Sequence, residues 1–429
     1  MELIFFLLPL LVSAYPGFKN DNMSPSKLHA LLVAGSNGIE NYRHQADVAH
    51  AYHLLVAKGV PPNNIIVMMY DDVASDPRNP TPGQLRNAPD GPDYYSGLKI
   101  DYKLGDVNVD NFVAVLTGNS KKIKGKNNNK RVLKTTKNDN IFLFIVDHGA
   151  PGFVSMPSGK VLTKRTLQDA IKKARFSQLS VYIEACEAGS MLAGMENDLS
   201  VFGLTASTAT QPSYACNCNG GTCYGDEFSV QWITDSEKNN LNNLGLVNQY
   251  SEVSKAVLGS TVCRFGSTFL NPIPVSHFQG ERSDIKLGAG QFNLNGPETL
   301  VPARDVPLYY YRTRAESVAN KTEREAALEQ IDAILQKRKM VDSLLHSMVN
   351  QLQNRTKVLS NRQSTDCMED LAKQFEESCH PFGQSPYLAG RMVVFAELVN
   401  EKDCSEVVTV LGELCKEINF VEDKTAKFL

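Results

Sequence analysis

Nearly continuous apolar runs alternate with amphipathic stretches through the first half of the chain. The runs are LHALLVAG (28–35), IIVMMY (65–70), IFLFIVDHG (141–149), LSVYIEAC (179–186) and VFGLTAS (201–207). Strands that are apolar on both faces and separated by helices are typical of a mostly parallel sheet covered on each side. The pattern therefore predicts an α/β domain with its site at the carboxyl ends of the strands.

The N-terminus has the character of a targeting segment. The sequence MELIFFLLPLLVSA has a short apolar core and ends in the small-residue pattern Val-Ser-Ala, although it starts with an acidic residue instead of a basic one. This pattern predicts a signal peptide over 1–14 and a route into an oxidising compartment. Three sequons, at Asn22, Asn320 and Asn354, fit N-glycosylation on that route.

The C-terminal part of the chain differs from the first half. Residues 286–320 are rich in glycine and proline and predict a linker. Beyond it, apolar residues recur at helical spacing, which predicts a small all-helical domain over 321–429. The chain has 429 residues, enough for more than one domain.

Composition argues against two other classes of partner. The net charge is −3, and the one basic run, KKIKGKNNNKR (121–131), lacks the interleaved aromatic residues of a nucleic-acid groove. We therefore expect no nucleic-acid partner. No later segment approaches the roughly 20 apolar residues that a membrane span requires, so we expect none.

Nine cysteines leave at least one thiol without an intramolecular partner. Cys186 and His148 both follow apolar strands, so neighbouring parallel strands would bring them to the same edge of the sheet. A histidine beside a cysteine can hold it as a thiolate nucleophile. The alternative is a histidine that ends a strand and an inert buried cysteine.

Motifs spread along the chain favour the first interpretation. They are VAGSNG (33–38), NYRHQADVAHAY (41–52), VMMYDD (67–72), NPTPG (79–83), VDHGAPG (146–152), YIEACEAGSM (182–191), SYAC (213–216), GDEFSVQW (225–232) and DVPL (305–308). In these motifs the chain resembles the legumains, the asparaginyl endopeptidases among the caspase-like cysteine proteases. The resemblance implies a caspase-like three-layer αβα sandwich over 28–285, a short propeptide over 15–27 and a C-terminal helical prodomain.

The resemblance also implies roles for individual residues. Cys186 would be the nucleophile, His148 the general base and acid, and Asn41 the polar partner of the histidine. Gly149 and the backbone at Cys186 would form the oxyanion hole. The substrate-binding positions implied by the family are Arg43, His44, Glu184, Ser213, Tyr214 and Asp226.

The chemistry of such a pocket follows from hydrogen-bonding capacity. A carboxamide offers an acceptor oxygen and a donor NH₂, so its pocket needs a fixed donor and fixed acceptors. Arg43 would supply the donors, and Glu184 and Asp226 the acceptors. Asparagine should then be cleaved over a broad pH range, and aspartate only under acid conditions.

Two positions in these motifs need separate mention. Asp147 matches an aspartate that can form a succinimide linked to peptide ligation in legumains; at rest, we expect it to accept local backbone hydrogen bonds. Ala188 stands where the family usually has serine. Since a small residue is kept, we expect activity to be retained.

The helical domain resembles the prodomain that lies over the active site of legumain zymogens. This implies disulfides Cys367–Cys404 and Cys379–Cys415 and removal of the domain by cleavage. Candidate autocleavage sites are Asn295, Asp305 and Asn320. Asn320 is also part of a sequon, and a glycan there would obstruct cleavage. Protonation of carboxylates across the contact predicts activation by acid.

Other assignments are weaker. His44, His50 and His53 share a predicted helix but lack a HEXXH motif, so we expect no metal and no cofactor. Cys216, Cys218 and Cys223 favour a local disulfide over a metal site, while their pairing and that of Cys263 stay open. The resemblance suggests a secreted or endolysosomal enzyme, monomeric once activated, with asparagine-containing protein substrates and cystatin-type inhibitors as partners. A peptide ligase and a catalytically silent binding protein are the alternatives.

Overall fold

The computed structural model describes residues 27–125, 130–158, 160–195, 197, 199–282, 299–353, 364–379 and 386–425. The predicted signal peptide, nearly all of the predicted propeptide, and Asn22, Asn295 and Asn354 lie outside these residues.

A six-stranded sheet in the order β11-β8-β7-β3-β1-β2 forms the centre of the peptidase domain. Its strands are β1 (Leu28–Ala34), β2 (Ile65–Met68), β3 (Asn140–Val146), β7 (Gln178–Glu184), β8 (Val201–Thr205) and β11 (Cys263–Gly266). Neighbouring strands are parallel except for β11, which runs antiparallel to β8. The five apolar runs identified in the sequence form the five parallel strands, so the predicted mostly parallel sheet is confirmed.

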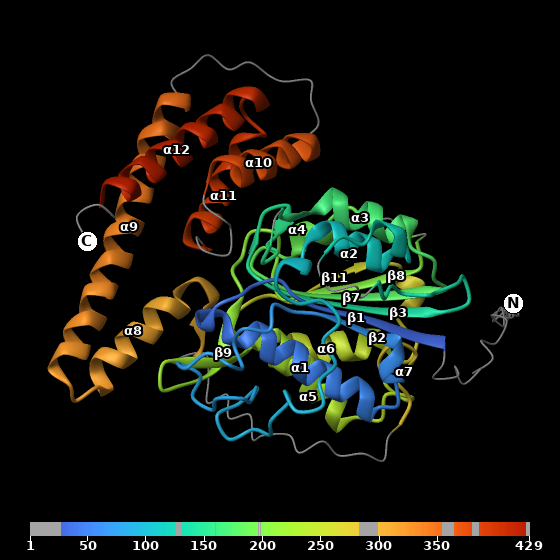
Figure 1. The fold of residues 1–429 in the computed structure, drawn as a ribbon. Helices are drawn as coiled ribbons and strands as arrows, with labels where there is room; N and C mark the ends of the chain where they lie inside the picture. Colours follow the sequence, from blue (N-terminus) through green and yellow to red (C-terminus); the bar gives the residue numbers. More distant parts are fainter. Residues whose placement is uncertain are drawn as a thin grey trace, which may run out of the picture.

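Helices cover both faces of this sheet (Figure 1). One face carries α1 (Tyr42–Ala57), α5 (Glu227–Lys238), α6 (Leu246–Ala256) and α7 (Ser276–Gln279). The other carries α2 (Val109–Leu116), α3 (Lys164–Lys173) and α4 (Gly189–Leu192). The sheet covered on both faces, predicted from the alternating pattern, and the three-layer αβα sandwich implied by the resemblance are therefore confirmed.

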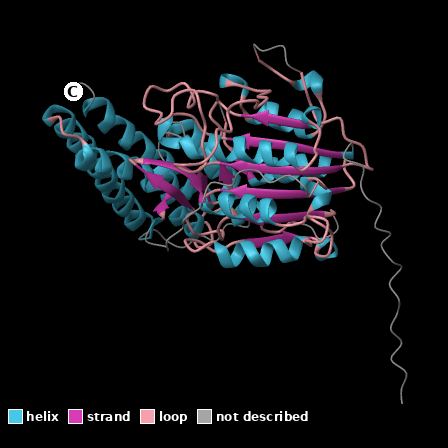
Figure 2. Cartoon of the chain, turned by 90° about the horizontal axis from the view of Figure 1, so that it is seen from below, coloured by secondary structure: helices cyan, strands magenta, loops and turns pink. Residues whose placement is uncertain are grey.

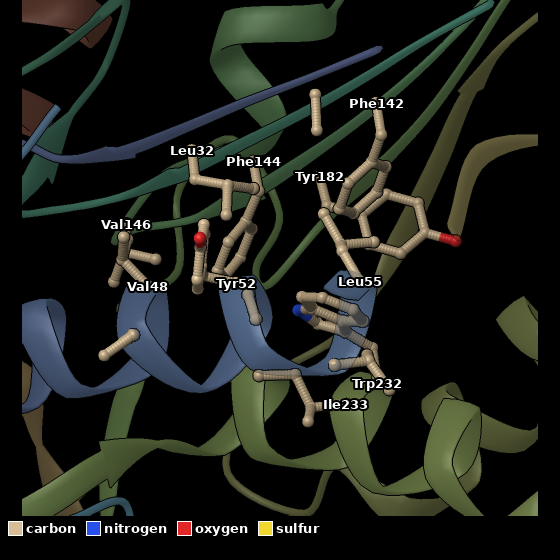
Figure 3. Close-up of a cluster of buried hydrophobic side chains, with 14 of the residues drawn as sticks. Leu32, Val48, Tyr52, Leu55, Phe142, Phe144, Val146, Tyr182, Trp232 and Ile233 are labelled. Carbon is tan, nitrogen blue, oxygen red and sulfur yellow. The ribbon is translucent and has the colours of Figure 1, made fainter. Parts of the chain in front are cut away.

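Aromatic packing holds α5 against the sheet. Trp232 of α5 is fully buried, and its ring meets those of Phe142, Phe144 and Tyr182 edge-on at centroid distances of 5.5, 5.0 and 5.5 Å. Figure 3 shows this cluster together with Leu55 of α1. Such edge-to-face contacts add about 0.5–1.5 kcal/mol each to the burial of the rings. The same cluster lies between α1, which carries Arg43 and His44, and α5, which begins directly after Asp226.

Two small sheets lie beside the main one. The first consists of β4 (Gly149–Ala150), β5 (Phe153–Val154) and β6 (Leu162–Thr163). The second has the order β10-β9-β12, from β9 (Tyr214–Asn219), β10 (Thr222–Asp226) and β12 (Val301–Pro302). Strand β12 belongs to the segment predicted to be a linker, so this segment contributes a strand to the peptidase domain.

The C-terminal part is helical, as Figure 2 also shows. Its helices are α8 (Val306–Ser317), α9 (Lys321–Gln353), α10 (Ser364–Ser378), α11 (Pro386–Leu398) and α12 (Cys404–Thr425). Helix α8 lies within the predicted linker. Its sequence VPLYYYRTRAES has no one-sided apolar face, which explains why helical periodicity did not reveal it.

Two disulfides link α12 to α10 and to the residue directly after it: Cys367–Cys404 and Cys379–Cys415. The helical domain also packs on the peptidase domain, where the rings of Phe153 and Phe375 lie 5.8 Å apart. Within the described residues, no helix combines the length and apolar character needed to cross a membrane.

Candidate active site

Strand register brings the two chemical motifs together. Val146 at the end of β3 pairs with Glu184 at the end of β7, and the Asp147 N–H donates to the Glu184 carbonyl at 2.9 Å. His148 and Cys186 each follow their paired residue by two positions, and both are buried. A Cβ atom on Gly149 would lie 1.9 Å from the Cys186 carbonyl oxygen, so only glycine allows β4 to approach this closely.

The hydrogen bonds of His148 define its tautomer. The Asn41 side chain donates through Nδ2 to the Asn37 carbonyl at 2.9 Å, which turns its Oδ1 toward His148 Nε2 at 2.7 Å. Nε2 must then carry the proton and donate it. Nδ1 has no hydrogen-bond partner among the described residues. Its lone pair is therefore free to accept a proton, as a general base requires.

The surroundings of His148 favour its uncharged form. Burial lowers its pKa well below the usual value, and the nearby cations Arg43 and Arg304 lower it further. A neutral imidazole can take a proton from a thiol, whereas an imidazolium cannot.

Cys186 is a buried thiol in this resting state. Its Sγ accepts a hydrogen bond from the Ser213 N–H at 3.3 Å and lies 3.6 Å from Ser213 Oγ. Burial raises the pKa of Cys186; the Arg304 guanidinium lowers it, and the Glu187 carboxylate raises it. The thiol must lose its proton before it can attack a substrate. The oxyanion-hole role of Gly149 stays a prediction.

Arg43, Glu184 and Asp226 form a buried charged group at the positions of the predicted pocket. Arg43 Nε donates to Asp226 Oδ1 at 2.8 Å, and Glu184 Oε2 accepts from the N–H and hydroxyl of Ser229 at 2.8 and 3.0 Å. One atom of each residue is left without a hydrogen-bond partner among the described residues: Arg43 Nη2, Glu184 Oε1 and Asp226 Oδ2. One donor and two acceptors of this group thus lack a hydrogen bond, although Asp226 Oδ2 also lies 3.6 Å from His44 Nε2. Buried polar atoms without a hydrogen bond are costly unless a ligand satisfies them.

The remaining predicted pocket residues lie around this group. His44 Nε2 is 3.6 Å from Asp226 Oδ2, while Nδ1 is 2.6 Å from Ser36 Oγ. Its ring meets that of His148 edge-on at 5.0 Å. Tyr214 is half-buried in β9, where it pairs with Pro302.

Two further positions follow the sequence expectations in different ways. Asp147 Oδ1 accepts a hydrogen bond from the His148 N–H at 2.6 Å, and burial raises the pKa of Asp147 well above its usual value. Its succinimide chemistry stays a prediction. Ala188 is fully buried, and its N–H donates to Ser207 Oγ at 3.1 Å. Its side chain belongs to the buried apolar cluster on the α2–α3–α4 face of the sheet.

Sequence reasoning missed a layer of polar residues behind the pocket. Asp47 Oδ1 accepts from Asn87 Nδ2 at 2.7 Å, and its Oδ2 accepts from the Asp226 N–H at 3.1 Å. The Asn87 side chain also forms a hydrogen bond with His50, and His50 in turn forms one with Glu237. Asp47 follows Arg43 by one helical turn on α1, and this i, i+4 spacing is the signal that could have found it.

Asp47 gives the stability of the domain a testable dependence on pH. Burial and the Asp226 carboxylate raise its pKa well above the usual value. The native state then retains a proton that the unfolded chain releases. Stability from this group is therefore present below the unfolded-state pKa of about 4 and is lost as pH rises through the native-state pKa. Asp47→Asn cannot ionise and escapes this loss.

We expect the Tm of Asp47→Asn to rise relative to wild type by about 3 °C or more between about pH 5 and about pH 7.5. Thermal unfolding followed by circular dichroism measures this difference. The exposed variant Asp110→Asn should show a constant difference from wild type. A constant difference for Asp47→Asn as well would contradict the expectation.

The second residue missed from sequence is Arg304. It lies in the predicted linker, yet its guanidinium contacts both oxygens of Glu187, with Nη1–Oε1 at 3.1 Å. Nη2 also donates to the Gly149 carbonyl at 2.9 Å, and Nε to the Pro386 carbonyl at 3.1 Å. Arg304 thus connects the loop after Cys186, strand β4 and the start of α11.

The other predicted sites lie apart from this centre. Asp305 forms an ion pair with Arg338 of α9 at 2.5 Å, and exposed Asn320 precedes α9, with its Oδ1 accepting from the Thr322 N–H at 2.9 Å. Cys218 and Cys223 form a disulfide. Cys216 and Cys263 are free thiols.

Comparison with known proteins gives this site its class. A cysteine and a histidine that follow neighbouring strands at the carboxyl end of a parallel α/β sheet are an arrangement typical of a cysteine peptidase. Residues 28–281, more than half of the chain, match the Peptidase C13 family. The chain belongs to this family.

Relatives extend the match across both domains. The chain is 36% identical to a hemoglobinase of Schistosoma japonicum, with 87% of this chain and 89% of that protein covered. It is 34% identical to the legumain of Mus musculus (88% and 89%) and 34% identical to the vacuolar-processing enzyme delta-isozyme of Arabidopsis thaliana (84% and 84%).

Among solved structures, caspase-1 of Spodoptera frugiperda matches with a TM-score of 0.37 at 8% identity, covering 61% of this chain and 92% of that one. The predicted resemblance to legumains and the assignment as a legumain-type cysteine endopeptidase are confirmed by the family and the relatives.

Proposed function

We propose that this peptidase cleaves protein chains after asparagine, with Cys186 as nucleophile and His148 as general base and acid. The observation that carries the proposal is the set of unpaired pocket atoms on Arg43, Glu184 and Asp226. A carboxamide oxygen would accept from Arg43 Nη2, and its NH₂ group would donate to the two carboxylate oxygens. An asparagine side chain therefore satisfies the donor and both acceptors at once.

The catalytic cycle follows from the tautomer of His148. Nδ1 takes the thiol proton, and the thiolate attacks the scissile carbonyl to give an acyl-enzyme. The proton then passes from His148 to the leaving amine as the peptide C–N bond breaks. Water, deprotonated by the same imidazole, attacks the thioester and releases the acid, which restores the thiol.

The same pocket supports cleavage after aspartate at low pH. Burial raises the pKa of Glu184 well above its usual value, and also raises that of Asp226, where Arg43 opposes the rise. As pH falls, a pocket carboxyl gains a proton and can donate a hydrogen bond to an aspartate carboxylate. Asparagine needs no such protonation, so its cleavage depends less on pH.

The chain would be made as an inactive zymogen. Arg304 lies against the nucleophile loop, and α11 covers Arg304, so substrate access requires that this segment move away. An ion pair between Arg165 and Asp366 also crosses from the peptidase domain to the helical domain. A signal-peptide pattern at the N-terminus supports synthesis in the secretory pathway and an endolysosomal or extracellular site of action.

The test is a reporter assay on the full-length chain before and after acid treatment. We expect Ala-Ala-Asn reporter cleavage to appear after acidification and to fall at least about 10⁴-fold in Cys186→Ala, because the nucleophile is removed. An Ala-Ala-Gln reporter is the matched substrate control. Equal cleavage by Cys186→Ala, or equal rates on the two reporters, would refute the proposal.

A further inference from the structure

A segment of the chain itself lies beside Cys186, first as strand β12 and then as a short 3₁₀ helix, η8 (Ala303–Asp305). Val301 and Pro302 of β12 pair antiparallel with Ala215 and Tyr214 of β9. The next residue, Ala303, donates its N–H to the Ser213 carbonyl at 3.0 Å. Since the Ser213 N–H itself donates to Cys186 Sγ, residue 303 stands at the end of the β9 edge, beside the nucleophile.

Arg304 continues the segment past the nucleophile. Its guanidinium donates hydrogen bonds to the Gly149 carbonyl and to the carboxylate of Glu187, the residue that follows Cys186. The Glu187 side chain is only 2% exposed. Backbone hydrogen bonds hold the loop there: Glu187 N–H to the Gln211 carbonyl at 2.7 Å, and Ser190 N–H to the Glu187 carbonyl at 2.9 Å. The carboxylate is therefore fixed and aimed at the position after residue 303.

We propose that Glu187 and the Gly149 carbonyl form a subsite that selects an arginine or lysine side chain on the residue after the scissile bond. This inference rests on the proposed peptidase function and adds the leaving-group side to its specificity. In the full-length chain Arg304 occupies the subsite. Arginine should be preferred over lysine, because only a guanidinium can pair both carboxylate oxygens and still donate to a carbonyl.

The electrostatics of the nucleophile favour the same substrates. Without a cation beside it, Glu187 would be a buried carboxylate with no charged partner, which is unfavourable. The Glu187 carboxylate also disfavours the Cys186 thiolate, whereas a guanidinium in the position of Arg304 favours it. A cationic residue in the substrate would thus compensate Glu187 and assist thiolate formation. Both effects should appear in kcat/KM.

The experiment uses peptides that differ only at the residue after asparagine: arginine, lysine, citrulline and leucine. Citrulline keeps the size of arginine but lacks its charge. The full-length chain is acidified to release activity, and kcat/KM is measured for each peptide. We expect arginine to exceed citrulline by about tenfold or more, with lysine between them. In Glu187→Gln the ratio of arginine to citrulline should fall to near one.

The exposed variant Glu252→Gln should keep the wild-type ratio. Equal rates for arginine and citrulline in the wild type would overturn the inference while leaving cleavage after asparagine intact, and this comparison needs no variant. An unchanged ratio in a folded Glu187→Gln would overturn it as well. If none of the peptides is cleaved, the proposed function fails and this inference fails with it.

Discussion

Arg43→Lys is expected to lower kcat/KM on asparagine substrates by about 10²- to 10³-fold. Arg43 is fully buried, and it both holds Asp226 through Nε and offers the unpaired Nη2 to a substrate. A lysine ammonium keeps the charge but cannot make both contacts from one planar group. The change therefore leaves either Asp226 or the substrate oxygen without its donor.

Peptide hydrolysis on the acid-treated protein measures this effect, and thermal unfolding checks that the variant is folded. Arg175→Lys, at an exposed arginine after α3, is the matched control and should retain activity within about twofold. If Arg43→Lys is folded and keeps a near wild-type kcat/KM for asparagine substrates, Arg43 does not bind the asparagine side chain.

Arg304→Ala is expected to give the full-length chain activity at neutral pH, without acid treatment. The Arg304 side chain is 15% exposed and Glu187 only 2%, so the variant leaves a buried carboxylate without its cation. Removing one partner of a buried ion pair costs about 3–5 kcal/mol. Even a third of that difference, applied to the closed state, would raise the open population about tenfold.

Initial rates on the Ala-Ala-Asn reporter at neutral pH measure the open population. Arg312→Ala, an exposed arginine on the neighbouring helix α8, should stay as inactive as the wild type. If Arg304→Ala is inactive at neutral pH but becomes fully active after acid treatment, the contact between Arg304 and Glu187 does not keep the full-length chain inactive.

The central sheet could be predicted because its strands are apolar on both faces. Few folds other than a parallel sheet covered by helices on each side can bury such strands. The meeting of His148 and Cys186 followed from the same logic, since parallel strands end at the same edge. The spacing of polar residues on α1 also points to Asp47, which lies one turn from Arg43 and accepts a hydrogen bond from the Asp226 N–H.

Arg304 could not be found in this way. Its sequence surroundings are those of a linker, and its contacts depend on residues more than a hundred positions away. Strand β12 could not be predicted for the same reason. Its two residues form a strand because the edge of β9 is available for pairing, not because of their own strand propensity. Helix α8 forms despite an unpatterned sequence because it packs along α9 (Figure 1).

The placement of the disulfides has a consequence for what remains after cleavage. Of the three bridges within the described residues, one lies inside the peptidase domain and two link α12 to α10 and to the residue directly after it. None of them connects the two domains. A single cut in segment 303–320 would therefore leave the helical part held to the peptidase domain by noncovalent contacts alone. Under the proposed zymogen function, its inhibition would then follow mass action: dilution would relieve it, and adding the separated part back would restore it.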